Sequence, residues 1–188
     1  MAVPSRMLAL GTTLPAFSLP DVTSGRTVSS SDLAGSPAVV IFICNHCPYV
    51  KHLRAGLAAF GRDIAPKGVK MVAISSNDVS AYPDDAPDKM ATEAKESGYT
   101  FPYLFDESQA AARAFDAACT PDLYIFDKDG RLAYRGQFDD SRPSNGKPVT
   151  GADARAAVDA LVRGERPSAE QTPSIGCSIK WKPGNAPA

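Results

Sequence analysis

Two cysteines separated by two residues form the part of the sequence best suited to chemistry. Cys44 and Cys47 lie in the stretch CNHCPYVKH, with His46 between them and Pro48 directly after them. Closely spaced thiols exchange with disulfides, condense after oxidation to a sulfenic acid, or bind a metal ion. In a chain without a disulfide scaffold, this spacing favours redox chemistry.

The position of the pair relative to a predicted helix distinguishes the two cysteines. Pro48 suits the first position of a helix, where a backbone N–H has no partner in any case. Cys47 then becomes the N-cap residue, and its sulfur faces the unpaired N–H groups of the first turn. Because these groups and the helix dipole stabilise a thiolate, we predict that Cys47 is the nucleophile. Cys44 lies one strand step earlier and gains no such field.

The two histidines near the pair each have a structural and a functional interpretation. The imidazole of His46 either faces solvent or lies close enough to raise the thiolate fraction of Cys47 near neutral pH. His52, one turn into the predicted helix, is more typical of a surface or half-buried residue. We therefore include only His46 among the candidate catalytic residues.

Hydrophobic periodicity predicts the elements that hold the pair. A Val- and Ile-rich run predicts a buried central strand, and apolar residues at three- and four-residue steps predict a helix after it. Strands and helices then alternate as in an α/β layer architecture, and a right-handed crossover would make the first two strands parallel. The predicted strands are 36–44, 69–75, 122–127 and 131–136, and the predicted helices are 49–67, 88–97, 107–115 and 151–163.

Length and composition restrict the class of protein. A chain of 188 residues suits a single domain with one core. Its formal net charge of −1 gives no reason to expect a nucleic-acid partner. It contains neither a segment typical of a signal peptide nor an unbroken run of about 18 apolar residues, so we expect no membrane association and a cytoplasmic location.

Several segments resemble a known family. The opening LGTTLPAFSLPDVTSGRTVSSSDLAGSPAVVIF and the later CTPDLYIFDKDGRLAYRG resemble thioredoxin-like proteins of the alkyl hydroperoxide reductase/thiol-specific antioxidant type. The stretches CNHCPYVKH, SNDVSAYPDDAPDKM, FPYLFDESQ and SIGCSIKWKPGN are similar to a bacterial subgroup of peroxiredoxin-like thioredoxin-family proteins. The resemblance implies a thioredoxin-like fold, with a central mixed β-sheet flanked by helices, an N-terminal extension and an insertion before the hairpin. We predict one domain over 8–163 and a docked C-terminal tail over 164–188.

The same resemblance implies roles for the cysteines. In these proteins a phenylalanine precedes the attacking cysteine by five residues, and a match on Phe42 selects Cys47. The usual resolving cysteine, three residues after the attacking one, is replaced here by Val50. Cys44 then becomes the second thiol of the pair.

A second segment matched by the resemblance contains Thr120 and Pro121. In the family, this loop carries a cis proline that faces the active-site cysteine and offers backbone groups to an extended substrate. Cys119 directly precedes it and lies either near the active site or in the core as a spectator. Cys177 lies in the tail, whose apolar residues favour docking, and it would act as a resolving thiol if the tail folds over the site.

Three functions remain open from the sequence. In a thiol-disulfide oxidoreductase, Cys47 attacks a disulfide on a protein or small molecule, Cys44 resolves the mixed disulfide, and a dithiol donates electrons. In a thiol peroxidase with antioxidant activity, a peroxide oxidises Cys47 to a sulfenic acid that condenses with Cys44. The third function is zinc binding by Cys44, Cys47 and His46, with Cys177 as a further ligand.

The second and third functions each lack an expected feature. Peroxiredoxins keep a threonine or serine where this chain has Cys44, and an arginine near the position of Pro121, where this chain has none. A zinc site lacks a second close-spaced ligand pair. The clusters Asn77-Asp78 and Asp84-Asp85 are interpreted as loop caps, because they lack the spacing of a calcium loop. We therefore predict a thiol-disulfide oxidoreductase without a metal or other cofactor.

Overall fold

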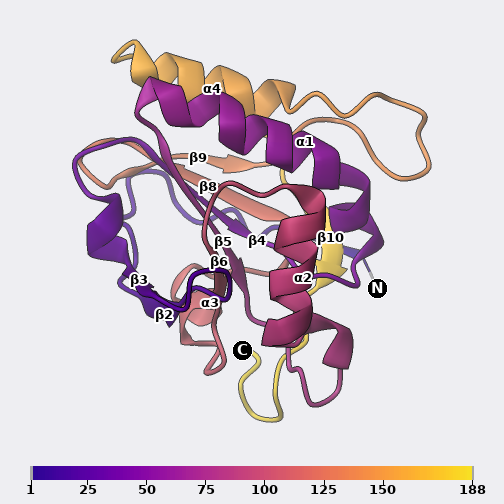
Figure 1. Cartoon of the computed structure of the whole chain (residues 1–188). Helices are drawn as coiled ribbons and strands as arrows, with labels where there is room; N and C mark the ends of the chain where they lie inside the picture. The colour runs from indigo at the N-terminus through magenta and orange to yellow at the C-terminus, as the bar shows by residue number, and fades with distance from the viewer. Residues whose placement is uncertain (1, 188) are drawn as a thin grey trace.

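A five-stranded sheet forms the centre of the computed structural model, which describes residues 2–187 (Figure 1). Its strand order is β6-β5-β4-β8-β9. β5 is parallel to both β4 and β6, whereas β8 is antiparallel to both β4 and β9. The strands are β4 (Ala38–Phe42), β5 (Lys70–Ser75), β6 (Tyr103–Phe105), β8 (Asp122–Phe126) and β9 (Leu132–Gly136).

Within residues 2–187, four α-helices and two smaller sheets surround this centre. The helices are α1 (Pro48–Ile64), α2 (Pro87–Ser97), α3 (Ala110–Ala114) and α4 (Ala152–Val162). One small sheet has the order β1-β10-β7, and the other pairs β2 with β3. Their strands are β1 (Ala2–Pro4), β2 (Ser18–Pro20), β3 (Thr27–Ser29), β7 (Cys119–Thr120) and β10 (Ile175–Ser178). Short 3₁₀ helices occupy Ser30–Leu33, Ala65–Lys67 and Pro83–Asp85.

The sheet is covered on both faces. α1 and α4 lie together over one face, and α3 lies toward the other (Figure 1). Successive residues of β4 alternate between the two sides: Val39 and Ile41 join the core that contains α1, while Val40 and Phe42 join the core that contains α3. All five residues of β4 are buried, as expected for a central strand of a sheet covered by helices.

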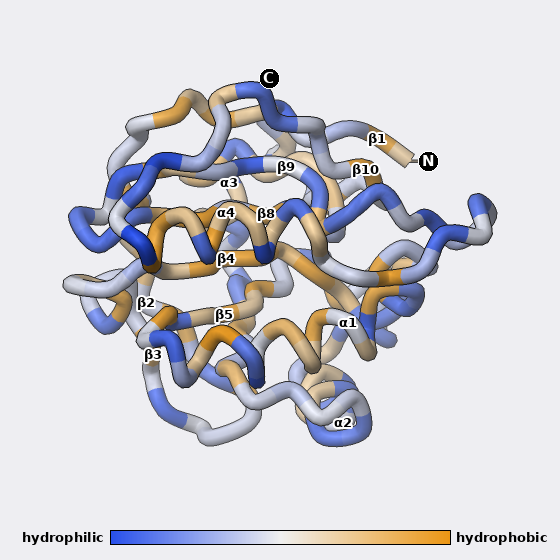
Figure 2. The backbone as a smooth tube through the Cα atoms, turned by 90° about the horizontal axis from the view of Figure 1, so that it is seen from above, coloured by the Kyte–Doolittle hydropathy of each residue, from blue (hydrophilic) through white to orange (hydrophobic). Residues whose placement is uncertain are grey.

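The hydropathy of the chain follows this layering. Figure 2 shows apolar residues concentrated in β4 and β5 and hydrophilic residues in the peripheral loops. Among residues 2–187, no helix is both long enough and apolar enough to cross a membrane.

The main elements agree with the predicted α/β arrangement, and the largest difference is in α3. The sequence predicts a helix over 107–115, but α3 begins only at Ala110. Gln109, before it, has a left-handed backbone with φ 62°. Its buried side-chain amide donates hydrogen bonds to the carbonyl oxygens of Ser76 and Lys180. Tertiary contacts to the C-terminal segment therefore override the local helical pattern at this point.

Candidate active site

Cys47 lies at the N-cap of α1, where the sequence predicts it. Its backbone is extended, with φ −68° and ψ 123°, Pro48 follows at the start of the helix, and the carbonyl oxygen of Cys47 accepts the first helical hydrogen bond from Lys51 N at 2.9 Å. The side chain is fully buried. The sulfur therefore combines the field of a helix N-terminus with exclusion from water.

The pairing of β4 with β8 brings the cysteine loop to the proline loop. Phe42, the last residue of β4, is opposite Asp122, the first residue of β8. The chain segments flanking these residues must therefore meet at one edge of the sheet. The Thr120-Pro121 peptide bond is cis, and the carbonyl oxygen of Thr120 accepts a hydrogen bond from the Cys47 thiol at 3.1 Å.

Cys44 lies on the other side of the same threonine. Its sulfur is 3.4 Å from the hydroxyl oxygen of Thr120, and the residue is only 1% exposed. Cys44 and Cys47 are both free thiols and belong to the same buried cluster. The structure thus brings the predicted pair and the predicted proline loop together in one site.

The pKa values of the two thiols of the pair are shifted in opposite directions. A hydrogen bond from the Cys44 thiol holds the pKa of Cys47 well below the usual range of a thiol, although burial opposes this effect. Further hydrogen bonds from Cys177, Thr120 and the backbone N–H of Val50 lower it in the same direction. The same thiol-thiol hydrogen bond, together with burial and the nearby carboxylate of Asp85, raises the pKa of Cys44. Cys47 is therefore the thiol of the pair that ionises first, and Cys44 is the hydrogen-bond donor that stabilises its thiolate.

His46 is placed next to Cys44 rather than next to Cys47. Its Nδ1 atom is 3.8 Å from the sulfur of Cys44 and 2.6 Å from Oδ2 of Asp85. Its ring also stacks on Tyr82, with 5.2 Å between the ring centroids. The imidazole is thus held between a carboxylate and an aromatic ring, on the Cys44 side of the site.

Asp85, which the sequence predicts to be a loop cap, is a residue of the site. The residue is fully buried, and its carboxylate accepts hydrogen bonds from the backbone N–H groups of Asn45 and His46 at 2.8 and 3.2 Å. Asn77 Nδ2 donates a further bond at 2.8 Å. Asp85 therefore fixes the loop between the two cysteines from a distance of about forty residues in sequence, which local spacing does not reveal.

Asn77, for which the sequence also predicts the role of a loop cap, has a different role in the structure. Its side-chain oxygen accepts a hydrogen bond from the backbone N–H of Lys180, in the C-terminal segment, while its amide nitrogen donates to Asp85. Asn77 thereby connects the tail to the carboxylate that holds the cysteine loop. Asp78, in contrast, accepts hydrogen bonds from the N–H and hydroxyl of Ser80, as expected of a loop cap.

The C-terminal segment lies directly against the site. β10 pairs antiparallel with β7, and Cys177 is opposite Thr120 in the register. Gly176 permits this approach, because a Cβ atom at that position would collide with the carbonyl group of Thr120. Cys177 is partly exposed and packs against the buried cluster that contains Cys47. Burial, followed by its hydrogen bond with Cys47, raises the pKa of Cys177 to about 11.

Cys119 is the thiol of the four that contacts neither cysteine of the pair in the hydrogen bonds of the described residues. It neighbours Thr120 on β7, so its side chain points to the opposite face of the strand. Its sulfur is 3.4 Å from the carbonyl oxygen of Pro121, and burial raises the pKa of its thiol. These surroundings are those of an inert core cysteine.

One group of side chains has the composition of a metal site. The ligand atoms of Cys44, His46 and Asp85 all lie within 4.8 Å of one another. The set differs from the zinc ligands proposed from the sequence, because Asp85 takes the place of Cys47 and Cys177. Both carboxylate oxygens of Asp85 already accept hydrogen bonds, so a metal ion would have to displace them.

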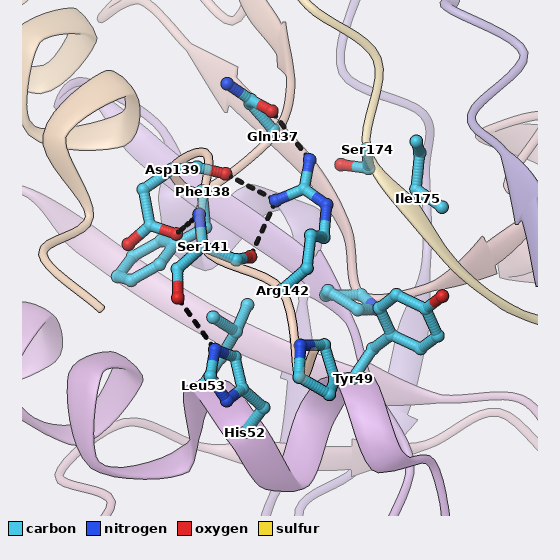
Figure 3. A pocket seen from close by; sticks show the side chains of 12 residues that line it. Tyr49, His52, Leu53, Gln137, Phe138, Asp139, Ser141, Arg142, Ser174 and Ile175 are labelled. Carbon is cyan, nitrogen blue, oxygen red and sulfur yellow. Dashed lines mark hydrogen bonds between the residues drawn. The ribbon is translucent and has the colours of Figure 1, made fainter. Parts of the chain in front are cut away.

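A shallow cleft opens beside the proline loop. It is bordered by the first turns of α1, by Pro121, by the loop 137–143 and by the residues that begin β10. In Figure 3, His52 Nε2 meets the hydroxyl of Ser141 at 2.7 Å, and the guanidinium of Arg142 turns toward Gln137 and Asp139. His52 is thus a half-buried residue that joins α1 to the loop 137–143, in agreement with the sequence-based interpretation. The apolar part of the cleft is formed by Tyr49, Leu53, Pro121 and Ile175.

The solved structures that are similar to this chain include the following three. A crystal structure of an uncharacterized conserved protein from Geobacillus kaustophilus is 54% identical, with a TM-score of 0.96 and 98% of each chain covered. A hypothetical protein from Sinorhizobium meliloti 1021 is 47% identical, with a TM-score of 0.94, covering 96% of this chain and 99% of the other. A candidate thioredoxin from Neisseria meningitidis is 25% identical, with a TM-score of 0.63 and coverage of 81% and 91%. Comparison with curated proteins gives no match.

These similarities confirm the thioredoxin-like fold implied by the sequence and support a redox function for the chain. The model of the AhpC/TSA family matches residues 10–135, which include the cysteine pair and the proline loop. Since this match covers well over half of its length, the chain belongs to the AhpC/TSA family.

Proposed function

We propose that the protein is a thiol-disulfide oxidoreductase that uses Cys47 as nucleophile and Cys44 as resolving thiol. The observation that carries the proposal is the contact between the two thiols at the N-terminus of α1, which lowers the pKa of Cys47 and raises that of Cys44. Cys47 is therefore able to attack as a thiolate, while Cys44 stays protonated until it resolves the mixed disulfide.

The reaction has two exchange steps. The Cys47 thiolate attacks one sulfur of a substrate disulfide, forms a mixed disulfide and releases the other substrate sulfur as a thiolate. Cys44 then loses its proton, attacks the sulfur of Cys47 and releases the first substrate sulfur. The products are a Cys44–Cys47 disulfide and two substrate thiols, so the substrate gains the two electrons that the protein loses.

The surroundings supply a route for the proton of Cys44. Once Cys47 is in a mixed disulfide, it carries no negative charge and no longer accepts the hydrogen bond of Cys44. The imidazole of His46 is 3.8 Å from the Cys44 sulfur and is held by Asp85. We assign to the imidazole, in the tautomer that carries its hydrogen on Nε2, the task of taking the proton on Nδ1 as Cys44 attacks, and to the Asp85 carboxylate the task of accepting the Nδ1–H that forms.

The substrate would approach through the cleft next to Pro121. Tyr49 and Ile175 give this cleft apolar walls, and Ile175 is 41% exposed. An extended segment of a protein substrate fits such a surface better than a peroxide alone, which needs no apolar contact. This favours disulfide-bearing proteins as substrates.

The test compares the oxidation of reduced protein by a model disulfide and by hydrogen peroxide. Rapid mixing with one equivalent of each, followed by acid quench and alkylation of free thiols, gives both rates and identifies the bridged cysteines. We expect faster oxidation by the disulfide and a Cys44–Cys47 bridge. Faster oxidation by peroxide would contradict the proposal.

The second candidate function is a thiol peroxidase, which the match to the AhpC/TSA family favours. A lowered pKa at Cys47 suits the attack on a peroxide as well as on a disulfide. Two observations count against it. Cys44 occupies the place of the threonine or serine that peroxiredoxins keep. Arg142, the arginine that lines the cleft, already donates hydrogen bonds from both terminal guanidinium nitrogens to oxygens of Gln137, Asp139 and Ser141.

A further inference from the structure

The three thiols around Thr120 differ in their access to solvent. Cys44 is 1% exposed and Cys47 is fully buried, whereas Cys177 is partly exposed. Cys47 contacts Thr120 through its carbonyl oxygen, and Cys177 is opposite Thr120 across the β7-β10 pair. A disulfide between Cys44 and Cys47 would therefore be enclosed, and the nearest thiol with a side open to solvent is Cys177.

We propose that Cys177 is the point at which an external dithiol delivers electrons to the active site, through a Cys47–Cys177 disulfide. This inference rests on the proposed function, because it starts from the oxidised Cys44–Cys47 pair. It goes beyond that function in assigning the recycling step to a thiol outside the Cys-x-x-Cys motif.

The exchange that transfers the oxidation is balanced within the protein. The sulfur of Cys177 loses its proton and attacks the sulfur of Cys47. The Cys44–Cys47 bond breaks as the Cys47–Cys177 bond forms, and Cys44 takes up a proton. No net oxidation or reduction occurs in this step, since one disulfide replaces another.

The donor then completes the cycle. One thiolate of the external dithiol attacks the sulfur of Cys177, forms a mixed disulfide with it and releases Cys47 as a thiolate. The second thiol of the donor attacks its own bridged sulfur and releases Cys177, which leaves the donor as a disulfide and the protein with three thiols. Cys47 suits this departure, because a thiol of low pKa is a good leaving group.

The surroundings of β10 hold Cys177 in place for this exchange. β10 is paired on both sides, with β1 and with β7. Gly176 lets the strand lie against the carbonyl of Thr120, and the next residues are tied down by hydrogen bonds from Ile179 N to Ala118 O and from Lys180 N to Asn77 Oδ1. A tail with this many contacts is part of the site and not a loose covering.

The test separates oxidation from recycling. Wild type and Cys177→Ser are oxidised with one equivalent of hydroxyethyl disulfide, freed of reagent and then mixed with excess dithiothreitol. Intact mass after acid quench and alkylation measures the rate of reduction. We expect equal oxidation in both proteins and, in the variant, reduction at least about tenfold slower, because the enclosed disulfide must wait for local opening.

A matched control is Cys119→Ser, which makes the same substitution on the other face of β7 and should leave the reduction rate unchanged. A second variant, Cys44→Ser, tests the bridge directly: after oxidation by the same reagent it should contain a Cys47–Cys177 disulfide by peptide mapping. Thermal unfolding of each variant checks that β10 remains docked, and Cys177→Ala replaces Cys177→Ser if the serine disturbs it.

The outcomes distinguish this inference from the proposed function. If the wild type forms a Cys44–Cys47 bridge and Cys177→Ser is reduced as fast as the wild type, the recycling role of Cys177 is wrong and the proposed function stands. A mixed disulfide that persists on Cys47 in Cys44→Ser, without transfer to Cys177, leads to the same conclusion. If the wild type forms no Cys44–Cys47 bridge with the disulfide, both proposals fail.

Discussion

The carbonyl oxygen of Thr120 lies 3.1 Å from the sulfur of Cys47. This contact joins the N-terminus of α1 to the loop before β8, two segments that are more than seventy residues apart in sequence. Its consequence is that the nucleophile is shielded by the same loop that would receive a substrate. Access to the sulfur then requires either a substrate disulfide in contact with Thr120 or a small displacement of β10, which pairs with β7.

Replacing each cysteine of the pair should produce a different defect. Cys47→Ser should abolish turnover of disulfides, because a serine hydroxyl is not ionised near neutral pH. Cys44→Ser should still attack but cannot form the Cys44–Cys47 bridge. When Cys177 is replaced by serine as well, no second thiol is left at the site and a species on Cys47 should accumulate: a mixed disulfide with a disulfide substrate, or a sulfenic acid with a peroxide. Intact mass of the quenched protein measures this. Turnover that survives Cys47→Ser and is lost in Cys44→Ser would reverse the assignment.

The reactivity of Cys47 should persist at acidic pH. Its lowered pKa depends first on the hydrogen bond from Cys44, so the ultraviolet absorbance of the thiolate should titrate with a midpoint below the ordinary thiol value of about 8.5. In Cys44→Ala the donor is absent, and the midpoint should move upward. Cys119→Ala is the matched control. A midpoint that is unchanged in Cys44→Ala would show that the helix terminus alone is responsible.

The same shift has a consequence for stability. A pKa that is lower in the folded than in the unfolded state contributes stability that is complete above the unfolded value and is lost as the pH falls through the folded value. The free energy of unfolding of Cys47→Ala should therefore fall relative to wild type as the pH rises from the folded pKa toward about 8.5. Urea unfolding of both reduced proteins over this range measures the difference.

Removal of the Asp85 carboxylate should loosen the loop between the cysteines. Asp85→Ala leaves the backbone N–H groups of Asn45 and His46 without their buried acceptor, so we expect a loss of about 3 kcal/mol in the free energy of unfolding. The rate at which Cys44 resolves a mixed disulfide should fall as well, while the attack by Cys47 is affected less. Asp84→Ala is the control, because only the backbone carbonyl of Asp84 contacts the loop in the described hydrogen bonds.

Zinc content tests the metal-binding function. The three donors near Cys44 match zinc chemistry, but the Asp85 carboxylate already accepts hydrogen bonds from the backbone N–H groups of Asn45 and His46 and from the side-chain amide of Asn77. We expect protein purified without chelator to contain well below one equivalent of zinc by elemental analysis. A stoichiometric content that Cys44→Ser abolishes would favour the metal site over the redox pair.

The sequence predicts the central elements and the position of Cys47 because both depend on local signals. Apolar periodicity defines β4 and α1, and Pro48 marks the helix start. The roles of Asp85 and Asn77 were not predictable in this way, because their partners lie in distant segments and their own neighbourhood has the composition of a loop. The strands β7 and β10 were missed for a related reason: they are two and four residues long and are formed by pairing, not by propensity.

Asp122 provides a test of the sheet edge that carries the proline loop. It is fully buried at the first position of β8, and burial raises its pKa to about 6 from the usual 3.8. A pKa that is higher in the folded state contributes stability that is complete below the unfolded value and is lost as the pH rises through about 6. At pH 7 the folded protein is therefore less stable by roughly 3 kcal/mol than it would be if Asp122 kept its usual pKa.

The loss of stability as Asp122 ionises predicts how the wild type differs from a variant that does not titrate at this position. Between pH 7 and pH 5 the free energy of unfolding of the wild type should rise relative to that of Asp122→Asn, in which the neutral amide has the same size and no titration. Asp129→Asn, an exposed turn position, is the matched control and should run parallel to the wild type. Urea unfolding at each pH measures the three curves. Parallel curves for wild type and Asp122→Asn would mean that Asp122 keeps an ordinary pKa, because water or a moving partner reaches the base of the proline loop.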